Sequence, residues 1–349
     1  MHYICRKKGE DTKTVNMKEN SDLQLSIIIP VYQAEKYVRP CLESVFNQGL
    51  DDEDFEVIIV NDGTKDRSME VIQDIIDQHK NITVISQENQ GLSVTRNNGM
   101  AMARGEYILM PDSDDLLVEN SIPTLLEKAL ETKADLVVAD FIETSGNEMP
   151  DYKCTHQTDI HYEEKTGERL FLEDLNPYQC YVWRTLFRRQ FLTDNQLSFI
   201  PGLTYQDVPF THQCYLRAQK CLRVHWLLNI YRKNHPSATS SFTKKKAMDF
   251  AAIIGATWKL RHTETLTPQT RQKLEDDVYC SFSILFYAML HSIKEPQDKR
   301  EIVEHLRQQV PDLHFTGNLK RRLESLLVTK YPPYLYLKIR EWHWKWIHR

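Results

Sequence analysis

LSIIIPV, residues 25–31, is the stretch of sequence that decides the fold. Its unbroken apolar run, with Ile27, Ile28 and Ile29 at the centre, is typical of a strand that is buried on both faces. Similar short apolar runs recur further along the chain, at Phe55–Val60, Ile82–Ile85, Tyr107–Met110 and Leu136–Val138. These runs predict further strands of the same sheet.

Amphipathic segments separate the apolar runs. After the first run, four apolar side chains fall on one helical stripe: Val38, Leu42, Val45 and Phe46. Pro40 fits that helix only in its first turn. A second helix is expected over residues 69–76, and Asn120 or Ser121 can cap a third that has Pro123 in its first turn. The alternation of strands and helices predicts an α/β domain with a mainly parallel central sheet.

The rest of the chain divides by composition. Residues 1–22 are polar and aperiodic, and predict a disordered leader. Residues 23–243 are expected to form the α/β domain, with a regular first half, 23–140, and a less regular half, 141–243, that is rich in aromatic and polar residues. Residues 244–349 predict a helical C-terminal region, with helices over 246–262, 268–293, 298–309, 318–329 and 333–347.

Charge and cysteine content limit the class of protein. The net charge of −5 disfavours a nucleic-acid partner. The seven cysteines contain no C-x-x-C pair, so neither a zinc site nor a disulfide framework is expected, and a reducing compartment is the better interpretation. No apolar run approaches the roughly 18 residues of a membrane span. The protein is therefore expected in the cytoplasm.

Three polar signals follow predicted strands. Pro30-Val31-Tyr32 closes the first, Asn61-Asp62-Gly63 closes the second, and Asp112-Ser113-Asp114-Asp115 follows the run that ends at Met110. A single aspartate at a strand end is often only a turn former. Because ligands of open parallel sheets bind beyond the carboxyl ends of the strands, the shared edge makes these signals a candidate ligand site.

The acidic segment 112–115 carries the clearest chemistry. Three carboxylates within four residues repel one another unless a cation or solvent screens them. Oxygen ligands beside a phosphate-bearing substrate suit Mg²⁺ or Mn²⁺. The alternative is a solvated acidic turn that caps the next helix.

Residues 25–140 resemble the nucleotide-sugar domain of family 2 glycosyltransferases, which have the GT-A fold. The resemblance is carried, in the order and approximate spacing of the family, by Ser26-Ile-Ile-Ile-Pro-Val-Tyr32, Val60-Asn-Asp-Gly63, Gly91-Leu-Ser-Val-Thr-Arg-Asn97 and Gly105-Glu-Tyr-Ile-Leu-Met-Pro-Asp-Ser-Asp-Asp115. It implies that the half 23–140 binds a nucleotide sugar and that the half 141–243 binds the acceptor.

The resemblance also implies roles for single residues. Pro30, Val31 and Tyr32 would line the nucleobase, and Asp62 would bind the uracil or its neighbourhood. A second set would hold the nucleotide and its metal ion: Arg96, Asp112, Ser113 and Asp114, with Asp112 and Asp114 as the D-x-D pair and Asp114 as the more direct metal ligand.

Beyond residue 140 the resemblance is weaker. Phe199-Ile-Pro-Gly-Leu-Thr-Tyr-Gln-Asp207 is similar to a family segment that ends in a Glu-Asp pair, whose aspartate is the catalytic base. The base would be Asp207, whereas Gln206 replaces the glutamate and leaves its contribution open. Tyr231-Arg-Lys-Asn-His-Pro-Ser237 resembles a stretch that closes over the diphosphate. His235 there is either a further metal or phosphate ligand or an ordinary surface histidine.

The C-terminus combines aromatic and basic residues. Trp342, Trp344 and Trp346 lie among Lys338, Arg340, Lys345 and Arg349. Such a helix either lies on an anionic membrane surface or packs its tryptophans on the domain, and both interpretations stay open. The first would place the protein at the inner face of the membrane.

The expected activity is that of an inverting glycosyltransferase of bacterial surface polysaccharide type. A nucleotide sugar, with UDP as the expected nucleotide, would be the donor, and a glycan or lipid-linked glycan would be the acceptor. A metal-dependent phosphoryl hydrolase or nucleotidyltransferase is an alternative, since D-x-D occurs there too. A non-catalytic nucleotide-binding partner is another, supported only by Gln206.

Overall fold

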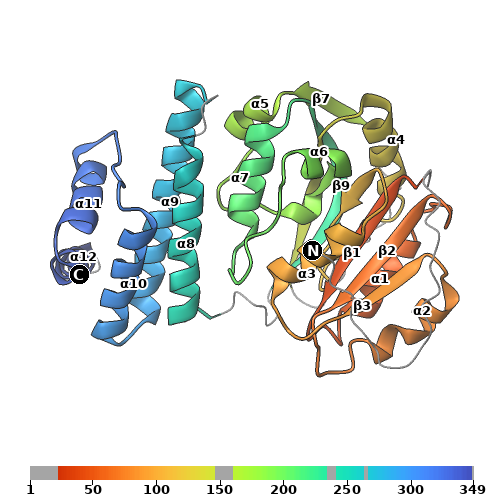
Figure 1. The fold of residues 1–349 in the computed structure, drawn as a ribbon, viewed down its shortest axis with the longest axis horizontal. Helices are drawn as coiled ribbons and strands as arrows, with labels where there is room; N and C mark the ends of the chain where they lie inside the picture. The colour runs from red at the N-terminus through yellow and green to blue at the C-terminus, as the bar shows by residue number, and fades with distance from the viewer. Residues whose placement is uncertain (1–22, 146–159, 234–240, 263–265, 348–349) are drawn as a thin grey trace.

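The structure is a computed structural model that describes residues 23–145, 160–233, 241–262 and 266–347. The predicted leader, residues 1–22, and His235 therefore lie outside the described residues. Figure 1 shows an α/β part built around one twisted sheet, and a stack of helices beside it.

One sheet runs through the α/β part. Its strands follow in the order β3 (Ile82–Ser86), β2 (Phe55–Asn61), β1 (Leu25–Val31), β4 (Tyr107–Leu109), β8 (Thr185–Arg188), β6 (Leu136–Ser145), β9 (Cys221–Lys233) and β5 (Leu116–Leu117), while β7 (His161–Lys165) also pairs with β9. The first four strands are parallel to one another. Beyond β4 the sheet is mixed, because β8 is antiparallel to both β4 and β6, whereas β6 and β9 are parallel.

Helices cover both faces of the sheet. One face packs against α1 (Val38–Phe46), η1 (Glu70–Ile72), α2 (Gln73–Gln78) and α4 (Ile122–Thr132). The other packs against α3 (Leu92–Met102), α5 (Gly167–Glu173), α6 (Arg189–Asp194) and α7 (Asp207–Arg217). Every residue of β1 is buried, and Ile27 and Ile29 face one core while Ile28 faces the other. The predicted doubly covered strand and the α/β class are confirmed.

One local prediction is confirmed in part and one is wrong. The helix expected over 69–76 is present, but it begins as a 3₁₀ turn, η1, that continues into the short helix α2. Neither Asn120 nor Ser121 caps α4 with its side chain. Instead the side-chain oxygen of the buried Gln48 accepts hydrogen bonds from the backbone N–H groups of Ser121 and Ile122, both at 3.0 Å. The cap comes from a residue more than 70 positions away, which local sequence rules do not consider.

The helical region consists of α8 (Lys244–Leu260), α9 (Pro268–Ser292), α10 (Pro296–Gln309), α11 (Leu319–Lys330) and α12 (Pro333–Ile347). These bounds lie within two residues of the predicted ones, so the helical character of this region is confirmed. Its core is aromatic, with Trp258, Phe282, Phe286 and Tyr336 fully buried. The division of the chain into 23–243 and 244–349 stays a prediction.

The aromatic tail lies on α12. Trp342 is 69% exposed, while Trp344 and Trp346 lie in α12 with side chains that the structure does not describe. Within the described part of the chain, no helix is both long and apolar enough to cross a bilayer. Attachment of the tail to a membrane stays a prediction.

Candidate active site

The predicted site residues gather at one edge of the sheet. Residues Val31 of β1 and Asn61 of β2 are paired, and β4 runs parallel to β1, so the segments after these strands leave from the same edge. Pro30 and Val31 are buried in the sheet, whereas Tyr32 is 46% exposed. Of these three predicted nucleobase contacts, Tyr32 alone presents its side chain to solvent.

Asp62 organises a loop. Its carboxylate accepts hydrogen bonds from the side chain of Gln87 at 2.8 Å and from the backbone N–H groups of Gln90 and Gly91 at 2.8 and 2.9 Å. Gly63 follows with φ +69°, and a side chain there would collide with the backbone of the same loop at Asn89. Asp62 therefore holds the loop that precedes α3. Its contact with a nucleobase stays a prediction.

An acid cluster forms the centre of this edge. We use this name for Asp112, Asp114 and Asp115, whose carboxylate oxygens lie within 4.8 Å of one another. Asp115 is 1% exposed; its Oδ1 accepts a hydrogen bond from the backbone N–H of Arg232 at 2.8 Å. Its Oδ2 has no hydrogen-bond partner among the described residues. Burial, and then the charges of Asp114 and Asp112, raise the pKa of Asp115 to about 9.

This cluster fits a hard divalent cation. Such ions prefer carboxylate oxygens. The Oδ2 atom of Asp115 is buried without a hydrogen-bond partner in the described part of the chain, and a bound cation would offset the free-energy cost of that burial. Sequence analysis named Asp112 and Asp114 as ligands but left out Asp115. The third carboxylate of the motif was visible in the sequence, whereas its burial was not.

Arg96 joins the acid cluster to the predicted base. Its side chain is fully buried, and its guanidinium Nη2 lies 2.6 Å from Asp112 Oδ1 while Nη1 lies 2.6 Å from Asp207 Oδ1. Nη1 also donates to the side-chain oxygen of Gln206 at 3.1 Å, and the guanidinium carbon lies 5.3 Å from the ring centre of Phe199. Both Nη groups thus hold carboxylates, and a direct contact of Arg96 with a nucleotide stays a prediction.

Asp207 is the first residue of α7. Its side chain is 22% exposed, so one part of the carboxylate faces the site while Oδ1 is held by Arg96. Burial raises the pKa of Asp207, and Arg96 opposes this rise. Gln206, which is 3% exposed, places a neutral amide against Arg96 where a family member would have a further carboxylate.

The segment before Asp207 is held by the helical region. We call residues 202–206 the base loop. Asp249 of α8 accepts hydrogen bonds from the backbone N–H and the hydroxyl of Thr204 at 3.2 and 3.0 Å. Tyr205 has a left-handed backbone, φ +60°, and its ring packs edge-on against Phe250 of α8 with centroids 5.1 Å apart. Contacts from α8 therefore support a strained turn next to the predicted base.

The helix α7 has a second attachment to the helical region. His212 is fully buried, with Nδ1 2.7 Å from the carbonyl oxygen of Val208 and Nε2 3.2 Å from Asp277 of α9. Lys273 lies 2.6 Å from the other oxygen of Asp277. Sequence analysis missed Asp249 and Asp277, because a polar residue in an amphipathic helix gives no signal of a distant partner.

The remaining predicted residues are only partly placed. Ser113 is half-buried between the aspartates, and the backbone oxygen of Asp114 accepts a hydrogen bond from Arg232 Nε at 3.0 Å. The ligand roles of Ser113 and Asp114 stay predictions.

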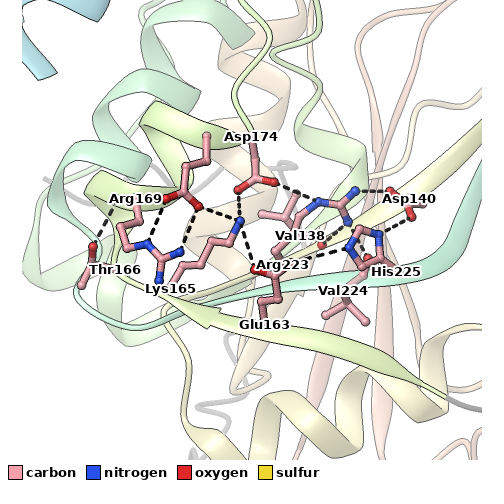
Figure 2. A network of polar contacts seen from close by, with 11 residues as sticks. Val138, Asp140, Glu163, Lys165, Thr166, Arg169, Asp174, Arg223, Val224 and His225 are labelled. Carbon is pink, nitrogen blue, oxygen red and sulfur yellow. Dashed lines mark hydrogen bonds and ion pairs between the residues drawn. The ribbon is translucent and has the colours of Figure 1, made fainter. Parts of the chain in front are cut away.

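A second charged group lies away from this edge, on β6, β7, β9 and the end of α5 (Figure 2). We call it the ion-pair network; it comprises Asp140, Glu163, Lys165, Arg169, Glu173, Asp174, Arg223 and His225. Lys165 is at its centre: its Nζ lies 2.7 Å from Asp174, 3.1 Å from Glu173 and 3.6 Å from Glu163, and its side chain is 5% exposed.

Comparison with known proteins gives one consistent result. Residues 26–194 match the profile of the family described as Glycosyl transferase family 2. The chain is 33% identical over 230 residues to the uncharacterized glycosyltransferase EpsJ of Bacillus subtilis (strain 168), covering 64% of this chain and 65% of that protein. It is 30% identical over 233 residues to the glycosyltransferase GlyA of Streptococcus pneumoniae serotype 4, covering 64% of this chain and 32% of that protein. The chain thus spans less than two thirds of the length of either relative.

The fold has a solved counterpart. The crystal structure of S. aureus TarS 1-349 in complex with UDP-GlcNAc superposes with a TM-score of 0.69 and 19% sequence identity, covering 93% of this chain and 92% of that one. At this level of identity the match concerns the fold alone. It extends over the sheet and the helical region together, and it confirms the predicted GT-A-like class with a helical C-terminal part.

Proposed function

We propose that this protein, whose residues 26–194 match glycosyl transferase family 2, is an inverting glycosyltransferase that moves a sugar from a UDP-sugar to a hydroxyl of a glycan or lipid-linked glycan. UDP as the nucleotide is supported by the resemblance of the first half of the chain and by the TarS complex with UDP-GlcNAc. The cytoplasmic location remains part of this proposal.

One observation carries the mechanism. Arg96 is hydrogen-bonded to Asp112, 16 residues after it in the chain, and to Asp207, 111 residues after it. The acid cluster and the predicted base therefore share one buried cation, although they come from distant segments, before β5 and at the start of α7. A transferase needs both groups within the length of one sugar, because the departing diphosphate and the attacking hydroxyl act on the same anomeric carbon.

The acid cluster would serve the leaving group. Asp112, Asp114 and Asp115 would hold Mg²⁺ or Mn²⁺, which supplies charge stabilisation to the departing diphosphate when bound. Arg96 keeps the Asp112 carboxylate in place through its 2.6 Å contact. Tyr32, with its exposed ring, and Asp62 would contact the nucleobase at the ends of β1 and β2.

Asp207 would serve the acceptor. Its carboxylate removes the proton of the attacking hydroxyl as the new glycosidic bond forms, and the bond to the diphosphate breaks on the opposite side of the sugar. Its raised pKa makes it a stronger base than a solvent-exposed aspartate. A single displacement assisted by one base inverts the configuration at the anomeric carbon.

The test separates binding from turnover. UDP binding is measured by calorimetry with Mn²⁺ and with EDTA, and UDP release is then followed with a panel of UDP-sugars and glycan acceptors. We expect Mn²⁺-dependent UDP binding and turnover of at least one UDP-sugar. Binding without any turnover would favour a non-catalytic nucleotide-binding partner. Transfer of a phosphoryl or nucleotidyl group in place of the sugar would favour the hydrolase or nucleotidyltransferase alternative.

A further inference from the structure

Three aromatic rings from two parts of the chain pack together. The rings of Tyr181 and Trp183 are stacked, with centroids 4.7 Å apart and planes 13° from parallel. The ring of Tyr231 lies 5.4 Å from the first and 5.5 Å from the second. Trp183 is 1% exposed, whereas the two tyrosines are half-buried. We call these three residues the aromatic platform; it combines a buried indole with two half-buried tyrosines.

The segments that carry the platform contact both the helix of the predicted base and the acid cluster. On one side, the backbone oxygen of Cys180 accepts a hydrogen bond at 3.0 Å from Thr211, which is one turn after Asp207 in α7. On the other side, the residue after Tyr231 donates its backbone N–H to Asp115. The pKa of Tyr231 is raised to about 12, first by burial and then by Tyr181 and the aspartates of the acid cluster, so its hydroxyl stays protonated.

The order of the strands places the platform at the same edge of the sheet as the acid cluster. The proposed nucleobase contacts follow β1 and β2, and the acid cluster follows β4. Tyr181 and Trp183 immediately precede β8, and Tyr231 lies in β9, beyond β4 in the sheet. β5, which directly follows the acid cluster, pairs with β9 next to Tyr231. A donor that extends from the nucleobase to the acid cluster therefore has its sugar at the cluster, and the platform lies beside that sugar and, through the hydrogen bond between Cys180 and Thr211, next to the helix of the predicted base.

From this placement we infer that the aromatic platform binds the C–H face of a pyranose ring in the acceptor. This inference rests on the proposed function. A pyranose presents several polarised C–H groups on one face, and the face of an aromatic ring carries the complementary negative charge. An acyclic polyol phosphate has no such ring face. The acceptor class is therefore a glycan that ends in a pyranose.

The probes are methyl β-D-glucopyranoside, methyl β-D-galactopyranoside and methyl N-acetyl-β-D-glucosaminide, with ribitol 1-phosphate as the acyclic comparison. Saturation-transfer NMR in the presence of UDP and Mn²⁺ measures their binding. We expect at least one pyranoside to bind, with saturation strongest on its ring C–H protons, and to bind better than ribitol 1-phosphate. Tyr181→Ala and Tyr231→Ala should each weaken it by about 5- to 10-fold, the scale of one aromatic contact.

Two controls separate ring stacking from loss of structure. Tyr181→Phe keeps the ring and should bind the pyranoside within about twofold of the natural protein. Tyr178→Ala removes a 64% exposed tyrosine of the same loop and should have no effect. Equal loss in Tyr181→Phe and Tyr181→Ala would overturn the inference, because the contact would then depend on the hydroxyl.

Further outcomes would also overturn the inference. If ribitol 1-phosphate binds as well as every pyranoside, the platform does not recognise a ring. If Tyr181→Ala weakens UDP-GlcNAc binding relative to UDP binding, the platform holds the donor sugar instead of the acceptor. Loss of Mn²⁺-dependent UDP binding in the natural protein would instead contradict the proposed function, which makes the two failures distinguishable.

Discussion

The acid cluster and the ion-pair network both gather carboxylates on one sheet, and they differ in how these carboxylates are paired. In the network, the single ammonium of Lys165 contacts three acids, and Arg223 links one of them, Asp174, to a fourth, Asp140 (Figure 2). In the cluster, Arg96 is shared between Asp112 and Asp207. Asp115 has one oxygen with no hydrogen-bond partner in the described part of the chain.

From this difference in pairing we infer different roles for the two groups of carboxylates. Interleaved cations let the network support the junction of β7, β9 and α5 without any ligand. The cluster instead keeps a buried carboxylate, Asp115, at an energetic cost that a bound cation would offset. Substitutions in the cluster should therefore change catalysis, and substitutions in the network should change stability.

The largest effect is expected for Asp114→Asn. The change keeps the size of the side chain but removes a negative oxygen from the proposed metal site, so transfer should fall by about 10³-fold. Mn²⁺-dependent UDP binding should weaken in calorimetry, while the midpoint of urea unfolding measured in EDTA stays close to that of the natural protein. Equal UDP affinity in Mn²⁺ and EDTA, for both proteins, would rule out the metal role.

Asp207→Asn should have the next largest effect. An amide keeps the hydrogen bond from Arg96 but cannot accept a proton, so kcat should fall by about 10²-fold or more. UDP binding should survive, because the nucleobase and metal contacts come from other elements. Transfer and UDP binding are to be measured on one preparation. Near-normal transfer would place the base elsewhere, and loss of both properties would indicate a structural role.

Lys165→Met tests the other side of the comparison. The variant keeps the length of the side chain and leaves Glu163, Glu173 and Asp174 without their shared cation, which should lower the free energy of unfolding by about 2 kcal/mol. Transfer at a temperature where the variant is folded should be unchanged. Lys133→Met, which removes an exposed pair with Glu106, is the matched control and should cost less than about 0.5 kcal/mol. Similar losses in both variants would make the network no different from ordinary surface pairs.

Gln206→Glu should have the smallest effect on activity. It tests how Arg96 is shared among carboxylates within the site. It adds a buried carboxylate beside Arg96, which already serves two acids, and should raise the pKa of Asp207 further by like-charge repulsion. Since the base acts when deprotonated, activity rises with pH through this pKa. The acidic limb of kcat/KM should therefore move to higher pH by about one unit. A shift to lower pH would contradict the shared-cation arrangement.

The sequence allowed much of the fold to be predicted, because the deciding signals are local. The apolar run 25–31 and the helical periodicities after residue 244 depend only on neighbours in the chain, and the structure has strands and helices there. The cap of α4 was predicted wrongly for the opposite reason, since its acceptor, Gln48, is distant in sequence.

The site was less predictable than the fold. Asp112, Asp114 and Asp207 could be named from resemblance, but their connection through Arg96 depends on α3 packing between two distant segments. In the sequence, the neutral Gln206 is visible only as a departure from the family pattern. In the structure its side-chain oxygen accepts a hydrogen bond from the guanidinium of Arg96.

The attachment of the base loop to α8 has a consequence for regulation. Asp249 and Phe250 hold Thr204 and Tyr205, two residues that lead directly into Asp207. Consider a molecule that binds the helical region, and whose affinity depends on the position of the base loop. Its binding would change the affinity of the protein for the acceptor by some factor. By thermodynamic reciprocity, acceptor binding would alter the affinity of the helices for that molecule by the same factor. Such a molecule would couple the helical stack to the sugar-transfer site through the base loop.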